Sequence, residues 1–161
     1  MLGYDVRFPL ACIMRLLFLL FGTLLGSTVV MAQTPDETAV KATITRLFDG
    51  MSKADSTMLK PLFAPGAQLQ TVQNKQGTVS VKEDAIAGFI ASVGKAKAGT
   101  LNEQLLGMDI NIDGDLATAW TPYSFYYNGQ QSHCGANAFT LVRIGGDWRI
   151  QTIIDTRRKC E

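Results

Sequence analysis

Residues 113–160 read DGDLATAWTPYSFYYNGQQSHCGANAFTLVRIGGDWRIQTIIDTRRKC, and this stretch decides the fold. It contains three two-residue turn signals, Asp113-Gly114, Asn128-Gly129 and Gly145-Gly146, which supply the positive φ that tight hairpins require. The runs between them are rich in β-branched and aromatic residues. We therefore expect three long antiparallel strands here, preceded by a fourth over residues 101–112.

Two-residue loops at all three turns fix the expected register. Trp120 then lies opposite Asn137, which lies opposite Ile154, and Ala119 lies opposite Met108. Because side chains alternate between the two faces, one face is expected to form the core beneath the helices. This expected core face carries Leu116, Trp120, Ser124, Tyr126, His133, Asn137, Phe139, Leu141, Trp148, Ile150, Thr152 and Ile154.

The opposite face is expected to be the outside of the sheet, because it is flatter and richer in small residues. Part of it forms a patch that carries two aromatic rings: Thr121, Tyr123, Phe125, Thr140 and Ile153. An exposed patch of this kind favours self-association, so we expect a homodimer through it. A single β-bulge would exchange the two faces beyond it.

Helical patterns precede the sheet. Thr34-Pro35-Asp36-Glu37 is a helix start signal with a cap, a proline in the first turn and an acidic capping-box residue. Apolar residues at helical spacing follow, a second short helix begins at Asp55-Ser56, and a third covers residues 82–93 after a small hairpin. Helices followed by mostly antiparallel strands predict an α+β domain. About three N-terminal helices should pack on the concave face of a curved sheet.

An apolar run, residues 16–30, follows Arg15 near the start of the chain. This layout is typical of a cleaved secretory signal peptide, with Met14 as the better-fitting start and cleavage after Ala32. The run is short for a membrane span, and an uncleaved anchor is the alternative. We expect an exported protein, periplasmic or secreted, in which residues 33–161 form a single domain.

Basic and acidic residues are equally numerous in residues 33–161. Without a basic block, the sequence gives no electrostatic reason to bind nucleic acid or an anionic membrane surface. One histidine and two cysteines supply too few ligands for a metal site at a recognised spacing. We therefore expect no metal or other cofactor, no nucleic-acid partner, and no stable membrane association after signal cleavage.

The two cysteines of this domain are Cys134 and Cys160. Exported proteins live where disulfides persist, and the expected register places Cys160 opposite Gln131, three positions from Cys134. A bridge forms if the C-terminal tail bends back over this distance. One buried thiol beside a frayed tail is the alternative.

The order of the expected elements resembles a known fold. Together with Asp113-Gly114-Asp115-Leu116-Ala117 and Gly145-Gly146-Asp147-Trp148-Arg149-Ile150, it is similar to the nuclear transport factor 2-like (NTF2-like) cone fold. More narrowly, Ser132-His133-Cys134-Gly135 and Thr156-Arg157-Arg158 resemble an exported bacterial group described as putative lumazine-binding. The resemblance covers most of residues 35–160. It implies a cone whose mouth holds a small apolar or heteroaromatic molecule.

Six residues of the expected core face are candidates to bind such a molecule. Trp120 and Phe139 would stack on it, whereas the hydrogen-bonding candidates are Ser124, Tyr126, His133 and Asn137. The alternative is structural, since aromatic strand residues usually fill the core and a lone histidine usually makes a structural hydrogen bond.

Enzymes of the resembled superfamily imply a pocket carboxylate that acts as a base. The expected core face offers only Asp109, whose neighbours suggest that it points to solvent. Asp155 is expected on the opposite face, beside Arg157. His133 and Asp155 are the candidates for catalytic groups, but no catalytic residue is assigned. The favoured function is an exported small-molecule-binding domain. An isomerase, dehydratase or hydrolase with Asp155 or Asp109 turned inward by a bulge stays open, as does a homodimeric protein-interaction module.

Overall fold

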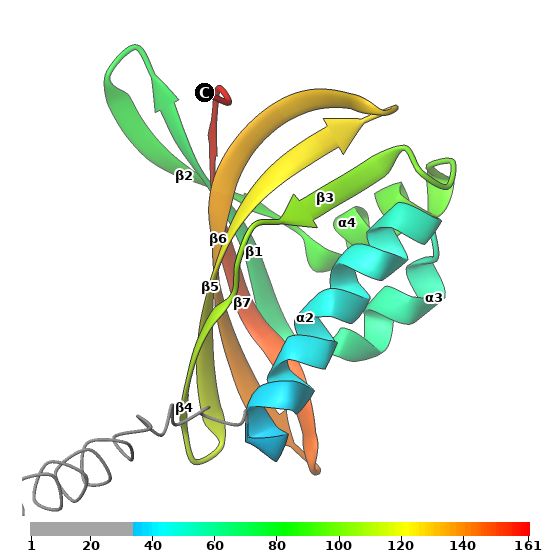
Figure 1. Ribbon diagram of the computed structural model, residues 1–161, viewed down its shortest axis with the longest axis vertical. Coiled ribbons are helices and arrows are strands. Elements are labelled where there is room, and N and C mark those ends of the chain that lie inside the picture. The colour runs from blue at the N-terminus through cyan, green and yellow to red at the C-terminus, as the bar shows by residue number, and fades with distance from the viewer. Residues whose placement is uncertain (1–33) are drawn as a thin grey trace, which may run out of the picture. The chain divides into compact units, whose positions relative to one another are not determined.

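The computed structural model of the chain describes residues 34–161, which lie within one compact unit. The expected signal peptide and its start at Met14 lie outside these residues. Three helices lie on one side of a curved sheet of seven strands, which does not close on itself (Figure 1). The predicted α+β architecture, with about three helices on one face of a mostly antiparallel sheet, is confirmed.

The helices are short except for the first. The helical elements are α2 (Pro35–Lys53), α3 (Ser56–Leu59), the 3-10 helix η1 (Lys60–Leu62) and α4 (Ile86–Lys95). Thr34 caps α2 as predicted, because its side chain accepts a hydrogen bond from the Glu37 N–H at 3.1 Å. The helix ends at Lys53, and its C-cap residue Ala54 adopts a left-handed conformation with φ of 55°.

The sheet order is β2-β1-β7-β6-β5-β3, and β4 pairs with β5 beside β3. The strands are β1 (Phe63–Lys75), β2 (Thr78–Asp84), β3 (Leu101–Leu105), β4 (Asp109–Asp113), β5 (Leu116–Tyr127), β6 (Gln130–Ile144) and β7 (Asp147–Arg158). All strand pairs are antiparallel except β1 with β7. The hairpin of β1 and β2 projects beyond the rest of the sheet (Figure 1).

Two expected element boundaries were wrong. The third helix begins at Ile86 rather than residue 82, because Lys82–Asp84 continues the hairpin and pairs with β1. The expected strand over residues 101–112 is broken into β3 and β4. Three residues there, 106–108, lie opposite only Thr121 and Pro122 of β5.

The predicted turns at Asn128-Gly129 and Gly145-Gly146 are confirmed, with positive φ at all four residues. The first turn is displaced by one residue to Gly114-Asp115, because Asp113 still pairs with Leu116.

Two β-bulges correct the expected faces of the sheet. Ser132 of β6 and Gln151 of β7 are extra residues that the partner strands do not match. Trp120 therefore faces Ala138 instead of Asn137, and Asn137 faces Asp155 instead of Ile154.

The consequence differs from strand to strand. On β6 the inner residues are those predicted, Asn137, Phe139 and Leu141. On β5 the prediction was inverted: Ala117, Ala119, Thr121 and Tyr123 are buried, whereas Leu116 and Trp120 are exposed. On β7 it holds for Trp148 and Ile150 and inverts after the bulge, where Ile153 and Asp155 are buried.

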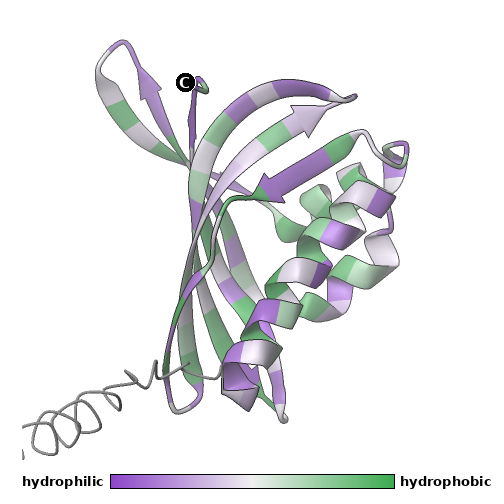
Figure 2. Ribbon diagram, in the orientation of Figure 1, coloured by the Kyte–Doolittle hydropathy of each residue, from purple (hydrophilic) through white to green (hydrophobic). Residues whose placement is uncertain are grey.

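The hydrophobic core fills the space between the helices and the inner face of the sheet. Apolar residues of α2 and α4 face the strands, while hydrophilic residues are frequent on the outward side of α2 (Figure 2). Val40, Ile44, Leu59, Leu141 and Ile150 are fully buried there. This core covers only part of the inner face, and a cavity occupies the rest.

Candidate functional site

A cavity of about 450 Å³ lies between α2, α4 and the inner face of the sheet. Its lining consists of Leu47, Phe48, Met51, Leu69, Asp84, Ala85, Gly88, Phe89, Ser92, Glu103, Asn137, Phe139, Ile153, Asp155 and Arg157. A volume of this size suits a small organic molecule. The helix residues of the lining are mostly apolar, and the strands contribute both apolar side chains, such as Phe139 and Ile153, and most of the polar ones.

Aromatic rings form much of the apolar wall. Phe48 of α2 meets Phe139 of β6 edge to face, with ring centroids 6.2 Å apart. Phe89 of α4 packs in the same way against Phe63, at 6.3 Å. Edge-to-face contact is a favoured arrangement of aromatic pairs, and Phe48, Phe89 and Phe139 all line the cavity.

We define the polar end of the cavity as Glu103, Asn137, Asp155 and Arg157. These residues form two hydrogen-bonded pairs. Asn137 Nδ2 donates to Glu103 Oε1 at 2.8 Å and to Thr121 Oγ1 at 3.2 Å. Arg157 Nε donates to Asp155 Oδ2 at 2.8 Å. The two pairs lie side by side because Asn137 of β6 faces Asp155 of β7 in the strand register, while Glu103 comes from β3, which is separated from β6 by β5.

Tyr123 supports this end from beneath. Its side chain is 1% exposed, and its hydroxyl donates to the Thr156 carbonyl at 3.0 Å and lies 3.3 Å from Asp155 Oδ2. It reaches β7 across Gly135, where a Cβ atom would overlap the Thr156 carbonyl oxygen and press on the tyrosine ring. Glycine is therefore required at position 135.

Burial raises the pKa of the Glu103 carboxyl to about 7, and the negative charge of Asp155 adds to the rise. The hydrogen bond from Asn137 and the charge of Arg157 oppose it. Burial, with help from Asp155, also raises the pKa of the Tyr123 hydroxyl, which stays protonated. Glu103 can therefore hold or release a proton near neutral pH.

Asp155 has one carboxylate oxygen in use and one without a partner. The residue is 7% exposed, both of its hydrogen bonds go to Oδ2, and within residues 34–161 the buried Oδ1 accepts none. A buried carboxylate oxygen without a donor is costly, and the residue that carries it lines the cavity.

Comparison with known proteins identifies the family. Residues 35–153 match the family described as Putative lumazine-binding. The chain belongs to this family. No curated protein sequence matches the chain.

Solved structures share the fold of this Putative lumazine-binding family member at low sequence identity. An NTF2-like protein of unknown function from Shewanella baltica is 19% identical with a TM-score of 0.62, over 80% of this chain and 100% of that one. A putative dehydratase of the NTF2-like family from Streptomyces avermitilis is 15% identical with a TM-score of 0.59, over 79% and 100%. A putative scytalone dehydratase from Novosphingobium aromaticivorans is 13% identical with a TM-score of 0.60, over 76% and 84%. These likenesses show the NTF2-like fold.

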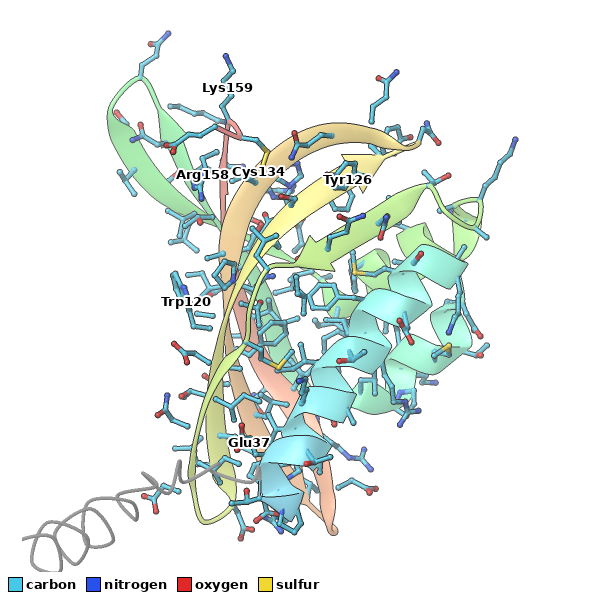
Figure 3. All side chains as sticks on the ribbon, in the orientation of Figure 1. Glu37, Trp120, Tyr126, Cys134, Arg158 and Lys159 are labelled. Atoms are coloured by element: carbon cyan, nitrogen blue, oxygen red, sulfur yellow. A yellow bond between two sulfur atoms is a disulfide. The ribbon has the colours of Figure 1, made fainter. Side chains whose placement is uncertain are left out.

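In this member of the Putative lumazine-binding family, two of the six predicted ligand-binding residues, Asn137 and Phe139, line the cavity. Trp120 is 50% exposed and projects from the sheet face opposite the helices (Figure 3). Ser124 is buried with its hydroxyl 3.3 Å from Cys134 Sγ. Tyr126 is half-buried near the end of β5, outside the cavity lining.

The two candidate catalytic residues separate in the structure. Asp155 points into the cavity, because the bulge at Gln151 turns it inward. His133 lies outside the cavity lining, where its ring contacts those of Tyr123 and Phe125, and its Nδ1 is 3.2 Å from the Ser132 hydroxyl. Burial lowers the pKa of His133, and Arg157 adds to the effect. Asp109 is exposed, as expected.

The sequence interpretation missed Glu103, Arg157 and the helix residues Phe48 and Phe89. A signal for Glu103 was present: Leu101, Glu103 and Leu105 alternate along one strand, so a carboxylate shares a face with two leucines. The inward position of Arg157 depends on the bulge at Gln151. No sequence signal at Gln151 predicts that bulge.

The patch predicted for homodimerisation is not a surface. Thr121, Tyr123 and Ile153 are buried on the helix side of the sheet, while Phe125 and Thr140 are half-buried. The bulges moved these side chains from the outer face to the inner one or split them between the faces. Self-association remains a prediction, but the exposed patch on which that prediction was based is absent from the described surface.

The predicted bridge between Cys134 and Cys160 is present, with Cα atoms 5.1 Å apart. It ties the residues after β7 to β6 beside Ser124. Within residues 34–161, no group of three or more His, Cys, Asp or Glu side chains could hold a metal ion. No helix in the described part of the chain combines the length and apolar character needed to cross a membrane.

Proposed function

We propose that this protein binds a small heteroaromatic molecule in the cavity between α2, α4 and the sheet. The observation that carries the proposal is the combination of aromatic walls, Phe48 and Phe139, with the polar end on one side of the same cavity. Apolar walls hold a flat ring, and a few convergent polar groups orient it. The family's description, Putative lumazine-binding, supports a ligand of this class.

Isothermal titration with lumazine tests the proposal, because α4 offers a blocking variant and a matched control. Gly88 lines the cavity, and a Cβ added there meets no atom within 4 Å. Gly88→Phe should fill the cavity and abolish binding. Ala87→Phe adds the same ring to the neighbouring position, outside this cavity lining, and should leave binding unchanged. If both Gly88→Phe and Ala87→Phe bind lumazine as the unsubstituted protein does, the ligand binds outside this cavity.

A second function has one specific observation in its favour: the Glu103 carboxyl, with its pKa of about 7, lies in the cavity wall. A group that gains and loses a proton near neutral pH suits an isomerase, dehydratase or hydrolase that moves protons on its substrate. We would follow hydrogen–deuterium exchange at the acidic carbon of 2-indanone by NMR. Glu103→Gln should remove any protein-dependent exchange. Equal exchange with the variant would exclude Glu103 as the base.

We also propose that the protein is exported. The apolar run after Arg15 and the Cys134–Cys160 disulfide support this, since disulfides persist in oxidising compartments. Cell fractionation followed by sequencing of the mature N-terminus would test it, with Gln33 as the expected first residue. An intact N-terminus on protein in the membrane fraction would point to an uncleaved anchor.

A further inference from the structure

We propose that the ligand of this cavity is an organic cation, an aromatic amidine or an aromatic ring that carries an alkylammonium group, whose N–H groups are accepted by Asp155 and Glu103. The inference rests on the proposed binding function and names the chemical class of its ligand.

The charges of the lining leave a surplus of negative charge. Three carboxylates line the cavity, whereas among residues 34–161 Arg157 is the one cationic side chain in the lining. Asp84 is paired with Lys82 at 2.7 Å and Asp155 with Arg157 at 2.8 Å. Glu103 forms no salt bridge within the described part of the chain and accepts only the neutral amide of Asn137. A cation on the ligand would balance this carboxylate.

The polar end offers two carboxylates as acceptors, and its remaining donors are the Nη groups of Arg157, of which Nη2 lies 3.4 Å from Thr71 Oγ1. The amide group of Asn137 already donates to Glu103 and Thr121, and the Tyr123 hydroxyl is directed to Thr156 and Asp155. The Oδ1 atom of Asp155 is buried without a donor in the described structure. A ligand with N–H groups would satisfy this oxygen, whereas an anionic or acceptor-only ligand could use only Arg157 and would lie against two carboxylates.

The apolar wall fits the same class of ligand. Phe48, Phe89 and Phe139 all line the cavity, so a cation held at the polar end has aromatic rings in the same chamber. The negative faces of such rings attract organic cations that have been withdrawn from water. A flat cationic ring system can therefore use both parts of the site.

Binding of a cation should also be linked to proton release. Glu103 is surrounded by Asp155 and Arg157 on β7 and by Tyr123 on β5, and it shares the cavity with Asp84. On its other side it shares a groove with Lys41 and Asp49 of α2. With a pKa near 7, Glu103 becomes charged as the pH rises through neutral. Affinity for a permanent cation should thus rise between pH 6 and 8.

Three nearly isosteric probes separate charge from shape: benzamidine, benzamide and benzoate. We expect benzamidine to bind roughly tenfold more tightly than benzamide at about pH 8, with benzoate the weakest, because charged hydrogen bonds are stronger than neutral ones. Asp155→Asn and Glu103→Gln should each reduce this preference. If Asp155→Asn fails to fold, Glu103→Gln still provides the test. It should also remove the rise in benzamidine affinity with pH.

The outcomes distinguish this inference from the proposed function. Lumazine binding that Gly88→Phe abolishes, together with equal affinities for benzamidine and benzamide, would overturn the cation and keep the cavity. Tightest binding of benzoate would overturn it as well. If Gly88→Phe changes the binding of neither lumazine nor benzamidine, the proposed function and the inference both fail.

Discussion

Glu103 is a carboxylate that the fold partly removes from water, and its raised pKa makes stability depend on pH. Below about pH 4.5 the carboxyl is protonated in both the folded and the unfolded chain. As pH rises through about 7, the unfolded chain already carries the charge and the folded chain must accept it in the cavity wall. The stability contributed by neutral Glu103 is therefore lost across this range.

Glu103→Gln should stabilise the unliganded protein at alkaline pH. The amide keeps an oxygen to accept the Asn137 hydrogen bond but cannot become charged. We expect a gain in free energy of unfolding on the order of 2 kcal/mol at about pH 8.5 and almost none near pH 4.5. Urea denaturation at both pH values measures it, with Glu83→Gln on exposed β2 as the control. A gain that does not depend on pH would contradict burial of the Glu103 charge.

Strand pairing around Tyr123 depends on Gly135. The tyrosine of β5 crosses this glycine of β6 to reach the backbone of β7, so three strands meet at one contact. Gly135→Ala should lower the free energy of unfolding by about 2–3 kcal/mol, because the added methyl group overpacks a site bounded by backbone. Thermal unfolding measures the loss. Gly129→Ala is not a matched control because of its positive φ, whereas Gly88→Ala in α4 is, and it should be neutral or stabilising.

The elements of this fold are largely predictable from local signals. Thr34 and Pro35 mark the start of α2, and Asn128-Gly129 and Gly145-Gly146 mark two hairpins, because capping and positive φ depend on the residues present there. The bulges at Ser132 and Gln151 have no such mark, since each is one unmatched residue and only long-range pairing reveals it. Asn137 and Phe139 therefore lie on the inner face of the sheet, as the alternation of side chains predicted. Beyond the bulges the alternation is reversed, so Trp120 and Asp155 lie on the face opposite to the predicted one.

The disulfide acts on the whole domain, because it links the end of the chain to the middle strand of the sheet. It closes a loop with a sequence separation of 26 residues. Chain-entropy arguments give a stabilisation of about 3 kcal/mol for a loop of this length. Cys160→Ser should therefore lower the free energy of unfolding by roughly that amount under oxidising conditions. Calorimetry with and without reductant measures it, and the variant itself should not respond to reductant.

The bulge at Gln151 also determines which deletions the gene can tolerate at this place. In-frame loss of that one codon would remove the unmatched residue and join Ile150 directly to Thr152, whose partners Leu141 and Thr140 are already neighbours on β6. Asp155 would stay opposite Asn137, and Arg157 opposite Gly135, on the same face of the sheet. A descendant with a single-residue gap beside Ile150 would therefore keep the polar end of the cavity.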